Sequence, residues 1–151
     1  MKAYSLGLYE KSMPSELSWK EKLQAAKEAG YDYIELSIDA TEEKIKRLEM
    51  TKEERFNLIR TMYEVGIPIR TMCVSALTKY SLGNDKPEYC ARGMEILEKS
   101  IQFADDLGVR VVMIPGYDVY YEPSTVETKR RYLENLKKGA QLAEKAGVIL
   151  G

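Results

Sequence analysis

The chain has 151 residues, a length typical of one domain. It is 44% hydrophobic and 31% charged, which indicates a globular protein and argues against a disordered or membrane-spanning chain. Its 23 basic and 24 acidic residues nearly balance, and no basic stripe stands out, so neither nucleic acid nor an anionic membrane is an expected partner.

The first predicted element is a strand at residues 3–10, "AYSLGLYE", which no helix precedes. The start of the chain has one early lysine but no long apolar segment and no small-residue cleavage site, so we expect no signal peptide. No apolar run approaches the roughly 20 residues that a membrane helix needs. The two cysteines, Cys73 and Cys90, form no C-x-x-C motif and are expected to be reduced thiols in a cytoplasmic protein.

A pattern of helical tail, glycine and short apolar run then repeats along the chain. Its glycines are Gly30, Gly66, Gly108 and Gly147, which lie 36, 42 and 39 residues apart. Glycine is favoured just after a helix because it adopts the left-handed conformation without steric cost. The apolar runs are short and rich in Val and Ile, which is typical of strands buried on both faces.

The segments between these strands have helical spacing and helix-start signals. A capping box, in which a hydroxyl and a glutamate three residues later satisfy free amides, predicts three of the starts. These boxes are Ser18 with Glu21, Thr51 with Glu54, and Ser124 with Glu127. Their expected apolar faces are Trp19, Leu23 and Ala26; Leu58, Ile59, Met62 and Val65; and Leu133, Leu136, Ala140 and Ala143.

A further helix is expected to begin near residues 85–88. Its expected buried face comprises Ile96, Leu97, Ser100, Phe103, Ala104 and Leu107. A shorter helix is expected at residues 40–48, with Asp39 as its N-cap.

Strands that alternate with helices at this spacing predict an α/β fold with parallel strands. One candidate is an open doubly wound sheet, but its phosphate-binding form needs a glycine-rich loop after the first strand, and residues 9–18 contain no glycine. The other is part of a (β/α)8 barrel, which typically needs about 250 residues. We favour the first four β/α units plus the start of strand five of such a barrel, a half-barrel.

Candidate site residues follow the strands, because active sites of such folds lie at the C-terminal strand ends. The chain has no histidine, which excludes Ser-His-Asp chemistry within it and leaves acid–base work to other groups. Glu35 lies within an apolar strand, where a carboxylate is costly unless it is paired or serves a ligand. Ser75 is a weaker candidate, and Arg47 is either an anion clamp or a solvated helix residue.

The loop "GYDVYY" is the most unusual candidate. It places Tyr117, Asp118, Tyr120 and Tyr121 where a polyol could stack and form hydrogen bonds. The alternative is that the tyrosines only cover the mouth of the barrel.

With "GLYEK", "YDYIELSID", "RTMCVSA" and "GYDVYY", the chain resembles the L-ribulose-5-phosphate 3-epimerases, within the pentulose- and hexulose-phosphate branch of the xylose-isomerase-like TIM barrels. The likeness covers residues 1–151, as the N-terminal half of such a domain. It implies a cytoplasmic sugar-phosphate epimerase of pentose or ascorbate catabolism. It also implies interconversion of L-ribulose 5-phosphate and L-xylulose 5-phosphate by proton transfer at C3, with a divalent metal (Mn, Mg or Zn) that polarises the C2 carbonyl.

The chain departs from that family in two ways. Leu77 stands where relatives typically have a histidine, so a polar contact to the substrate is expected to be missing. The metal ligands and the two proton-transferring glutamates of the family come from strands five to eight. We therefore expect no catalytic and no metal-binding residue in this chain, and no turnover by the chain alone. Glu35, Arg47, Ser75, Tyr117, Asp118 and Tyr120 are expected to line one side of the sugar-phosphate pocket.

An alternative hypothesis is a non-catalytic half-barrel that associates with itself or with another chain. Exposed sheet edges and apolar surface favour association, so a homo-oligomer is expected. A flavodoxin-like signalling or nucleotide domain is less favoured, since only Glu10 supplies an acidic group after the first strand.

Overall fold

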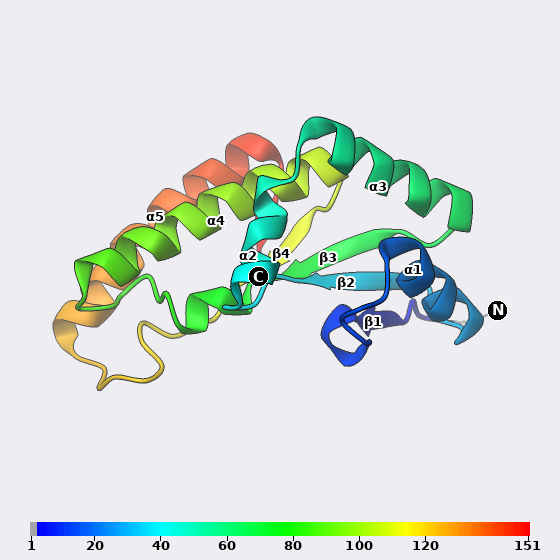
Figure 1. Ribbon diagram of the computed structural model, residues 1–151. Helices are drawn as coiled ribbons and strands as arrows, with labels where there is room; N and C mark the ends of the chain where they lie inside the picture. The colour runs from blue at the N-terminus through cyan, green and yellow to red at the C-terminus, as the bar shows by residue number, and fades with distance from the viewer. Residues whose placement is uncertain (1–2) are drawn as a thin grey trace.

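The computed structural model describes residues 3–151, and a curved parallel sheet forms its centre (Figure 1). The strands are neighbours in chain order, all parallel. They are β1 (Gly7–Tyr9), β2 (Tyr33–Ser37), β3 (Ile69–Cys73), β4 (Val111–Met113) and β5 (Ile149–Leu150). A doubly wound sheet reverses its strand order, whereas consecutive barrel units do not. The predicted half-barrel is therefore confirmed, although β1 is shorter than the expected strand at residues 3–10.

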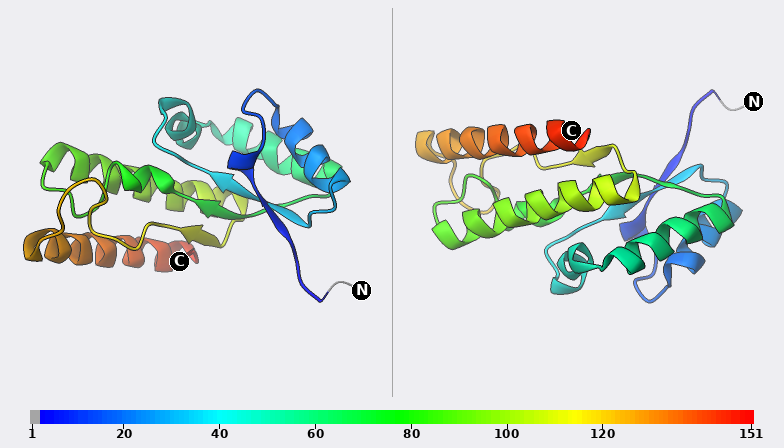
Figure 2. Two further views of the ribbon diagram at one scale, coloured as in Figure 1. Left: turned by 90° about the horizontal axis from the view of Figure 1, so that it is seen from below. Right: turned by 90° about the horizontal axis from the view of Figure 1, so that it is seen from above.

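Helices cover one face of this sheet. Viewed from below, the strands lie in front of the helices, and viewed from above α3, α4 and α5 lie in front of the strands (Figure 2). The helices are α1 (Trp19–Glu28), α2 (Glu42–Lys46), α3 (Lys52–Val65), α4 (Pro87–Leu107) and α5 (Val126–Ala146). Three short 3-10 turns are η1 (Glu10–Ser12), η2 (Arg47–Glu49) and η3 (Ser75–Thr78). None of the helices within residues 3–151 is long and apolar enough to cross a membrane.

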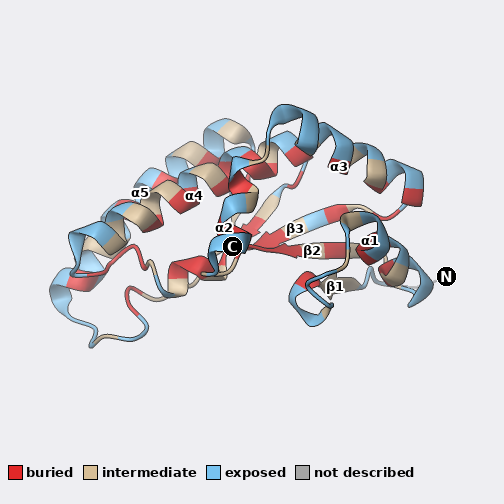
Figure 3. Ribbon diagram, viewed as in Figure 1, coloured by how far each residue is buried: buried red, intermediate tan, exposed pale blue. Residues whose placement is uncertain are grey.

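The core lies between the sheet and the helices. Alternate residues of the strands face it, so Ile34, Leu36 and Val112 are completely buried. Figure 3 shows buried residues along β2 and β3. The predicted buried face of α4, including Leu97, Phe103 and Ala104, contributes to the same core. None of the helices within residues 3–151 lies over the opposite face of the sheet, which would line the interior of a closed barrel (Figure 2). We call this the inner face.

Most of the helix-end predictions are confirmed. Ser18 with Glu21 and Thr51 with Glu54 form complete capping boxes. The four repeat glycines have positive φ angles between 65° and 82°, as the left-handed position after a helix requires. The start of α4 at Pro87 also falls within the expected range.

Two predicted N-caps are wrong. The N-cap of α5 is Thr125, whose box partner is Thr128, instead of Ser124 with Glu127. The N-cap of α2 is Thr41, whose hydroxyl accepts from the Lys44 amide. Asp39 instead accepts hydrogen bonds from the Thr41 amide and hydroxyl at 3.0 and 2.7 Å.

The buried stripe of α5 also differs from its predicted apolar face. Leu133 is 54% exposed, and the buried positions include Asn135, Gly139 and Ala143. Small or polar residues suit this face because α5 approaches α4 closely: a β-carbon on Gly139 would lie 2.5 Å from the Leu97 side chain. Hydrophobic spacing alone could not indicate that the contact depends on the absence of a side chain.

Candidate active site

Hydroxyl groups gather at the C-terminal ends of β3 and β4, where the fold predicts the site. A small open cavity of about 160 Å³ lies there, lined by Cys73, Ser75, Thr78, Met113, Ile114, Pro115 and Tyr117. The Tyr117 and Thr78 hydroxyls are 2.7 Å apart, so one of them donates to the other. The hydroxyl oxygen of Ser75 is buried and forms no hydrogen bond with another residue of the described chain. A buried hydroxyl without a partner is costly and is available to a ligand.

The loop at residues 116–121, "GYDVYY", which we call the tyrosine loop, adjoins this cavity through Tyr117. The ring of Tyr120 lies 5.0 Å from the rings of both Tyr117 and Tyr121, and the Tyr120–Tyr121 pair is edge-to-face. Tyr120 and Tyr121 are 59% and 72% exposed. Tyr120 is therefore linked to the cavity through Tyr117, which lines it, and Tyr121 lies against Tyr120.

Asp118 lies in the same loop but faces α5. Its carboxylate is buried and accepts hydrogen bonds from Ser124 at 2.8 Å and from Thr128 at 2.5 Å. Burial alone would raise the pKa of Asp118, but these hydrogen bonds outweigh it and keep the pKa below its ordinary value. The observed partners of Asp118 thus fasten the tyrosine loop to the start of α5.

Glu35 is on the inner face, partway along β2. It lies beside Tyr9 of β1 and Thr71 of β3, and it accepts a hydrogen bond from the Thr71 hydroxyl at 2.8 Å. It is absent from the lining of the cavity at the ends of β3 and β4. The predicted site residues therefore fall into separate places: Ser75, Tyr117 and Tyr120 lie together, whereas Glu35, Arg47 and Asp118 have other neighbours.

Arg47 belongs to a buried ionic cluster that the sequence did not reveal. The carboxylate of Glu10 accepts hydrogen bonds from Lys22 at 2.8 Å, and from Lys44 and Arg47 at 2.7 Å each. A fourth bond comes from the Ser37 amide at 2.9 Å. We call Glu10, Lys22, Lys44 and Arg47 the Glu10 cluster. It joins the ends of β1 and β2 to α1 and α2.

The cluster holds the Glu10 carboxylate in its charged form. Burial alone would raise the pKa of this group, but the hydrogen bonds from Arg47, Lys22 and Lys44 outweigh burial and lower the pKa to about 2. Trp19 covers the cluster, with its ring 5.0 Å from the Arg47 guanidinium and 5.4 Å from the Lys22 ammonium. Lys22 occupies the same helical face as Trp19, Leu23 and Ala26. A lysine on an otherwise apolar helix face was the one sequence feature that could have indicated this buried cluster.

Tyr9 precedes the cluster and lies on the inner face. Its hydroxyl is 3.3 Å from that of Ser37. Burial raises the pKa of the Tyr9 phenol, and burial likewise raises the pKa of the Cys73 thiol. Both groups are therefore neutral at neutral pH, and both cysteines are free, as predicted.

Leu77 does not face the cavity. It is 3% exposed and packs in the core beneath η3. The side chain at this position thus contributes to packing in this chain.

The described residues do not fit a divalent metal. Within residues 3–151, no three side chains of His, Cys, Asp or Glu lie close enough together to hold an ion. A hollow of about 400 Å³ lies at the other end of the strands and is lined mainly by apolar groups of α3, β3 and α4. We derive no metal-dependent step from the residues of this chain.

Comparison with known proteins agrees with this architecture. The chain is 42% identical over 149 residues to L-ribulose-5-phosphate 3-epimerase UlaE of Escherichia coli O139:H28, covering 99% of this chain and 52% of that protein. UlaE of Escherichia fergusonii is 41% identical over the same length. The chain thus spans about half the length of the curated relatives it matches.

Solved structures share the fold at low sequence identity. D-psicose 3-epimerase, crystallised in the presence of D-fructose, superposes with a TM-score of 0.77 at 16% identity, over 97% of this chain and 51% of that one. An L-ribulose 3-epimerase superposes with a TM-score of 0.70 at 24% identity, over 97% and 48%. The sequence profile described as "Xylose isomerase-like TIM barrel" matches residues 23–151. The chain therefore belongs to the xylose isomerase-like TIM barrel family, and the relatives named here are sugar epimerases.

Proposed function

We propose that this chain forms the N-terminal half of a sugar-phosphate epimerase that interconverts L-ribulose 5-phosphate and L-xylulose 5-phosphate. The observation that carries the proposal is the 42% identity to L-ribulose-5-phosphate 3-epimerase UlaE over 99% of this chain. The hydroxyl-lined cavity at the ends of β3 and β4 supports it, because a polyol substrate needs several hydrogen-bonding groups beside apolar surface.

The proposed role of this chain is to bind and orient the sugar. Ser75, Thr78 and Tyr117 would exchange hydrogen bonds with sugar hydroxyls, and the rings of Tyr120 and Tyr121 would pack against its C–H groups. Orientation matters because an acid–base group removes the proton on the carbon beside a carbonyl only when it is held within hydrogen-bonding reach of that proton. A bound divalent metal (Mn, Mg or Zn) would polarise the C2 carbonyl of the substrate. We assign neither the metal nor the proton transfer to residues of this chain.

A titration of the 151-residue chain with L-ribulose 5-phosphate tests the binding role. We expect backbone amide NMR shifts to concentrate at Ser75, Thr78 and Tyr117, without turnover in the presence of Mn²⁺, Mg²⁺ or Zn²⁺. The Tyr117→Phe variant should weaken binding about tenfold, the effect of losing roughly 1.4 kcal/mol. Shifts confined to the hollow beside α3, or turnover by the chain alone, would contradict these roles.

A further inference from the structure

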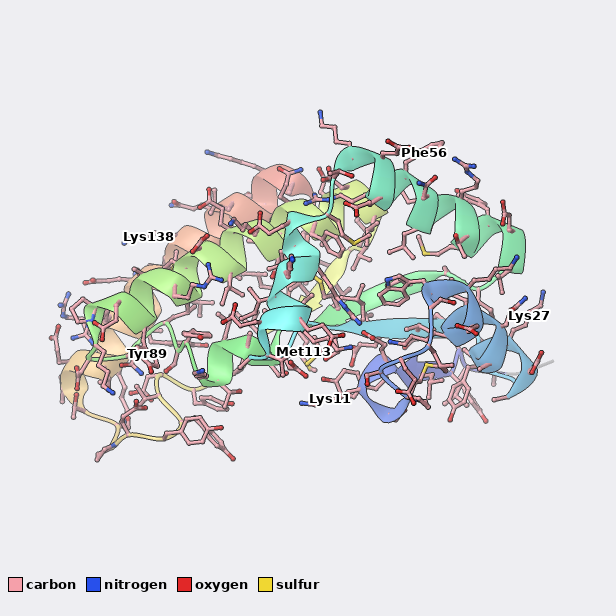
Figure 4. All side chains as sticks on the ribbon, in the orientation of Figure 1. Lys11, Lys27, Phe56, Tyr89, Met113 and Lys138 are labelled. Atoms are coloured by element: carbon pink, nitrogen blue, oxygen red, sulfur yellow. The ribbon has the colours of Figure 1, made fainter. Side chains whose placement is uncertain are left out.

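Two loops meet at the C-terminal ends of β3 and β4, beside the hydroxyl-lined cavity. One is the tyrosine loop, and the other comprises residues 79–86, which connect η3 to α4. We call the second the β3–α4 loop. Figure 4 shows this end of the molecule, where Tyr89 marks the first turn of α4. The hydroxyl of Tyr117 lies 2.7 Å from that of Thr78, the residue just before the β3–α4 loop. The spacing of the two loops therefore sets the place of the Tyr117 hydroxyl.

Gly83 of the β3–α4 loop contacts the tyrosine loop directly. Its amide donates to the Asp118 carbonyl oxygen at 3.1 Å. A β-carbon on Gly83 would lie 2.5 Å from the carbonyl oxygen of Thr128 and 2.6 Å from that of Asp118, well inside van der Waals contact. The φ angle of Gly83 is not positive, so alanine would suit the backbone conformation and the obstruction is steric. The contact between the loops thus depends on glycine at this position.

The β3–α4 loop is held firmly on its other side by α5. The Leu82 carbonyl oxygen accepts a hydrogen bond from the Asn135 side-chain amide at 2.9 Å. The guanidinium of Arg131 donates to the carbonyl oxygens of Gly83 and Asn84 at 2.7 Å each. These bonds fix the backbone on both sides of Gly83. A side chain at this position would therefore displace the groups that it meets and leave the β3–α4 loop in place.

The groups that it would meet belong to one fastened unit. The hydroxyls of Ser124 and Thr128 both donate to the same carboxylate oxygen of Asp118, Oδ2, at 2.8 and 2.5 Å. The carbonyl oxygens of Asp118 and Thr128 are also the two nearest to a β-carbon on Gly83. Because Asp118 follows Tyr117 directly in the chain, displacement of this unit moves Tyr117 away from Thr78.

We propose that Gly83 and Asp118 are positioning residues for sugar binding, which act by holding the Tyr117 hydroxyl against Thr78. The two hydroxyls can bind one sugar only if the loops keep their spacing, because a hydrogen bond requires a narrow range of distance and angle. The side chain of Asp118 faces α5, so it affects binding through the loop and not by touching the sugar. This inference rests on the proposed function, in which Tyr117 binds the sugar.

The ligand-free 151-residue chain provides the first test. Nuclear Overhauser effects should connect the Tyr117 ring with the Thr78 methyl group in wild type and be lost in Gly83→Ala. Gly139→Ala is the matched control, because its β-carbon would lie 2.5 Å from the Leu97 side chain, where α4 meets α5. It disturbs packing away from both loops and should keep the effects. Their retention in Gly83→Ala, or their loss in both variants, would overturn the proposal.

Variants of Asp118 test the same role by another route, which also serves if circular dichroism shows that Gly83→Ala does not fold. Asp118→Ala removes the acceptor of two hydroxyl groups and should lose the contact between Tyr117 and Thr78. Asp118→Asn keeps an oxygen that can accept from both hydroxyls and should restore the contact. An intact contact in Asp118→Ala, or an equal loss in the two variants, would contradict positioning by these hydrogen bonds.

Binding of L-ribulose 5-phosphate is the second measurement. Gly83→Ala should weaken binding about tenfold, as Tyr117→Phe does, and the double variant should bind no more weakly than Tyr117→Phe alone, because both changes remove one contact. Additive losses would overturn positioning through Tyr117. Absence of binding by wild type would instead contradict the proposed function, and the contact measured without ligand would still decide whether Gly83 and Asp118 position Tyr117.

Discussion

At the scale of single residues, Glu10 decides how the mouth of the half-barrel is held together. Its carboxylate is completely buried and joins partners that lie 12, 34 and 37 residues away in the sequence. Together with the bond from the Ser37 amide, four hydrogen bonds reach the two oxygens of this carboxylate. Removing its charge therefore leaves the three cations Lys22, Lys44 and Arg47 facing one another. Breaking a buried ion pair from one side costs more than the pair contributes, because the remaining charges stay buried.

We expect Glu10→Gln to lower the free energy of unfolding by about 3 kcal/mol at neutral pH. Urea unfolding followed by the fluorescence of Trp19, the one tryptophan in the chain, measures this directly and reports on the cluster itself. Glu28→Gln is a matched control on the exposed surface of α1 and should change stability by less than about 0.5 kcal/mol. Equal effects of the two substitutions would contradict the role of the cluster.

The pKa of Glu10 also predicts a pH dependence. Folding lowers this pKa from 4.5 to about 2, so the unfolded chain binds the proton more readily. The resulting stabilisation, about 3 kcal/mol, is complete above the unfolded pKa and disappears as the pH falls through about 2. Between pH 5 and pH 2, wild type should therefore lose more unfolding free energy than Glu10→Gln does. Parallel losses in urea titrations of the two proteins would argue against the lowered pKa.

At the scale of elements, local sequence predicted the helices better than their tertiary contacts. The boxes at Ser18 and Thr51 need only residues three apart, and both were predicted correctly. The start of α5 was misplaced by one residue because Asp118, in the preceding loop, binds the Thr128 hydroxyl. That interaction favours Thr125 and Thr128 over the equally plausible pair of Ser124 and Glu127. The four-residue motif alone cannot show which of the two boxes caps α5, because the choice depends on Asp118, which lies outside both motifs.

We expect Thr128→Val to destabilise the protein by roughly 1–3 kcal/mol. The substitution removes the hydroxyl that accepts from the Thr125 amide at 2.8 Å and donates to buried Asp118. Glu127→Gln, which alters the exposed residue of the rejected box, should cost less than about 0.5 kcal/mol. Thermal unfolding of both variants provides the comparison. A larger loss of stability for Glu127→Gln than for Thr128→Val would contradict the Thr125–Thr128 box and favour the predicted box of Ser124 with Glu127.

At the scale of the whole molecule, the sequence predicted the architecture because the repeat is local and regular. The glycine spacing indicated parallel units, and the missing glycine-rich loop argued against a doubly wound sheet. The site was predicted less completely. Ser75, Tyr117 and Tyr120 do lie together, but the close approach at Gly83 and the Glu10 cluster depend on contacts between distant parts of the chain that no single segment encodes.

The proposal that this chain supplies the sugar-binding half of an epimerase is best tested by joining it to a complementary half. The 151-residue chain would be fused to the C-terminal half of Escherichia coli UlaE, and interconversion of L-ribulose 5-phosphate and L-xylulose 5-phosphate would be followed with added Zn²⁺ or Mn²⁺. We predict turnover by the fusion, none by either half alone, and a loss of about tenfold in kcat/KM for Tyr117→Phe within it. A fusion that folds as a closed barrel but neither binds nor interconverts these sugars would contradict the proposed function.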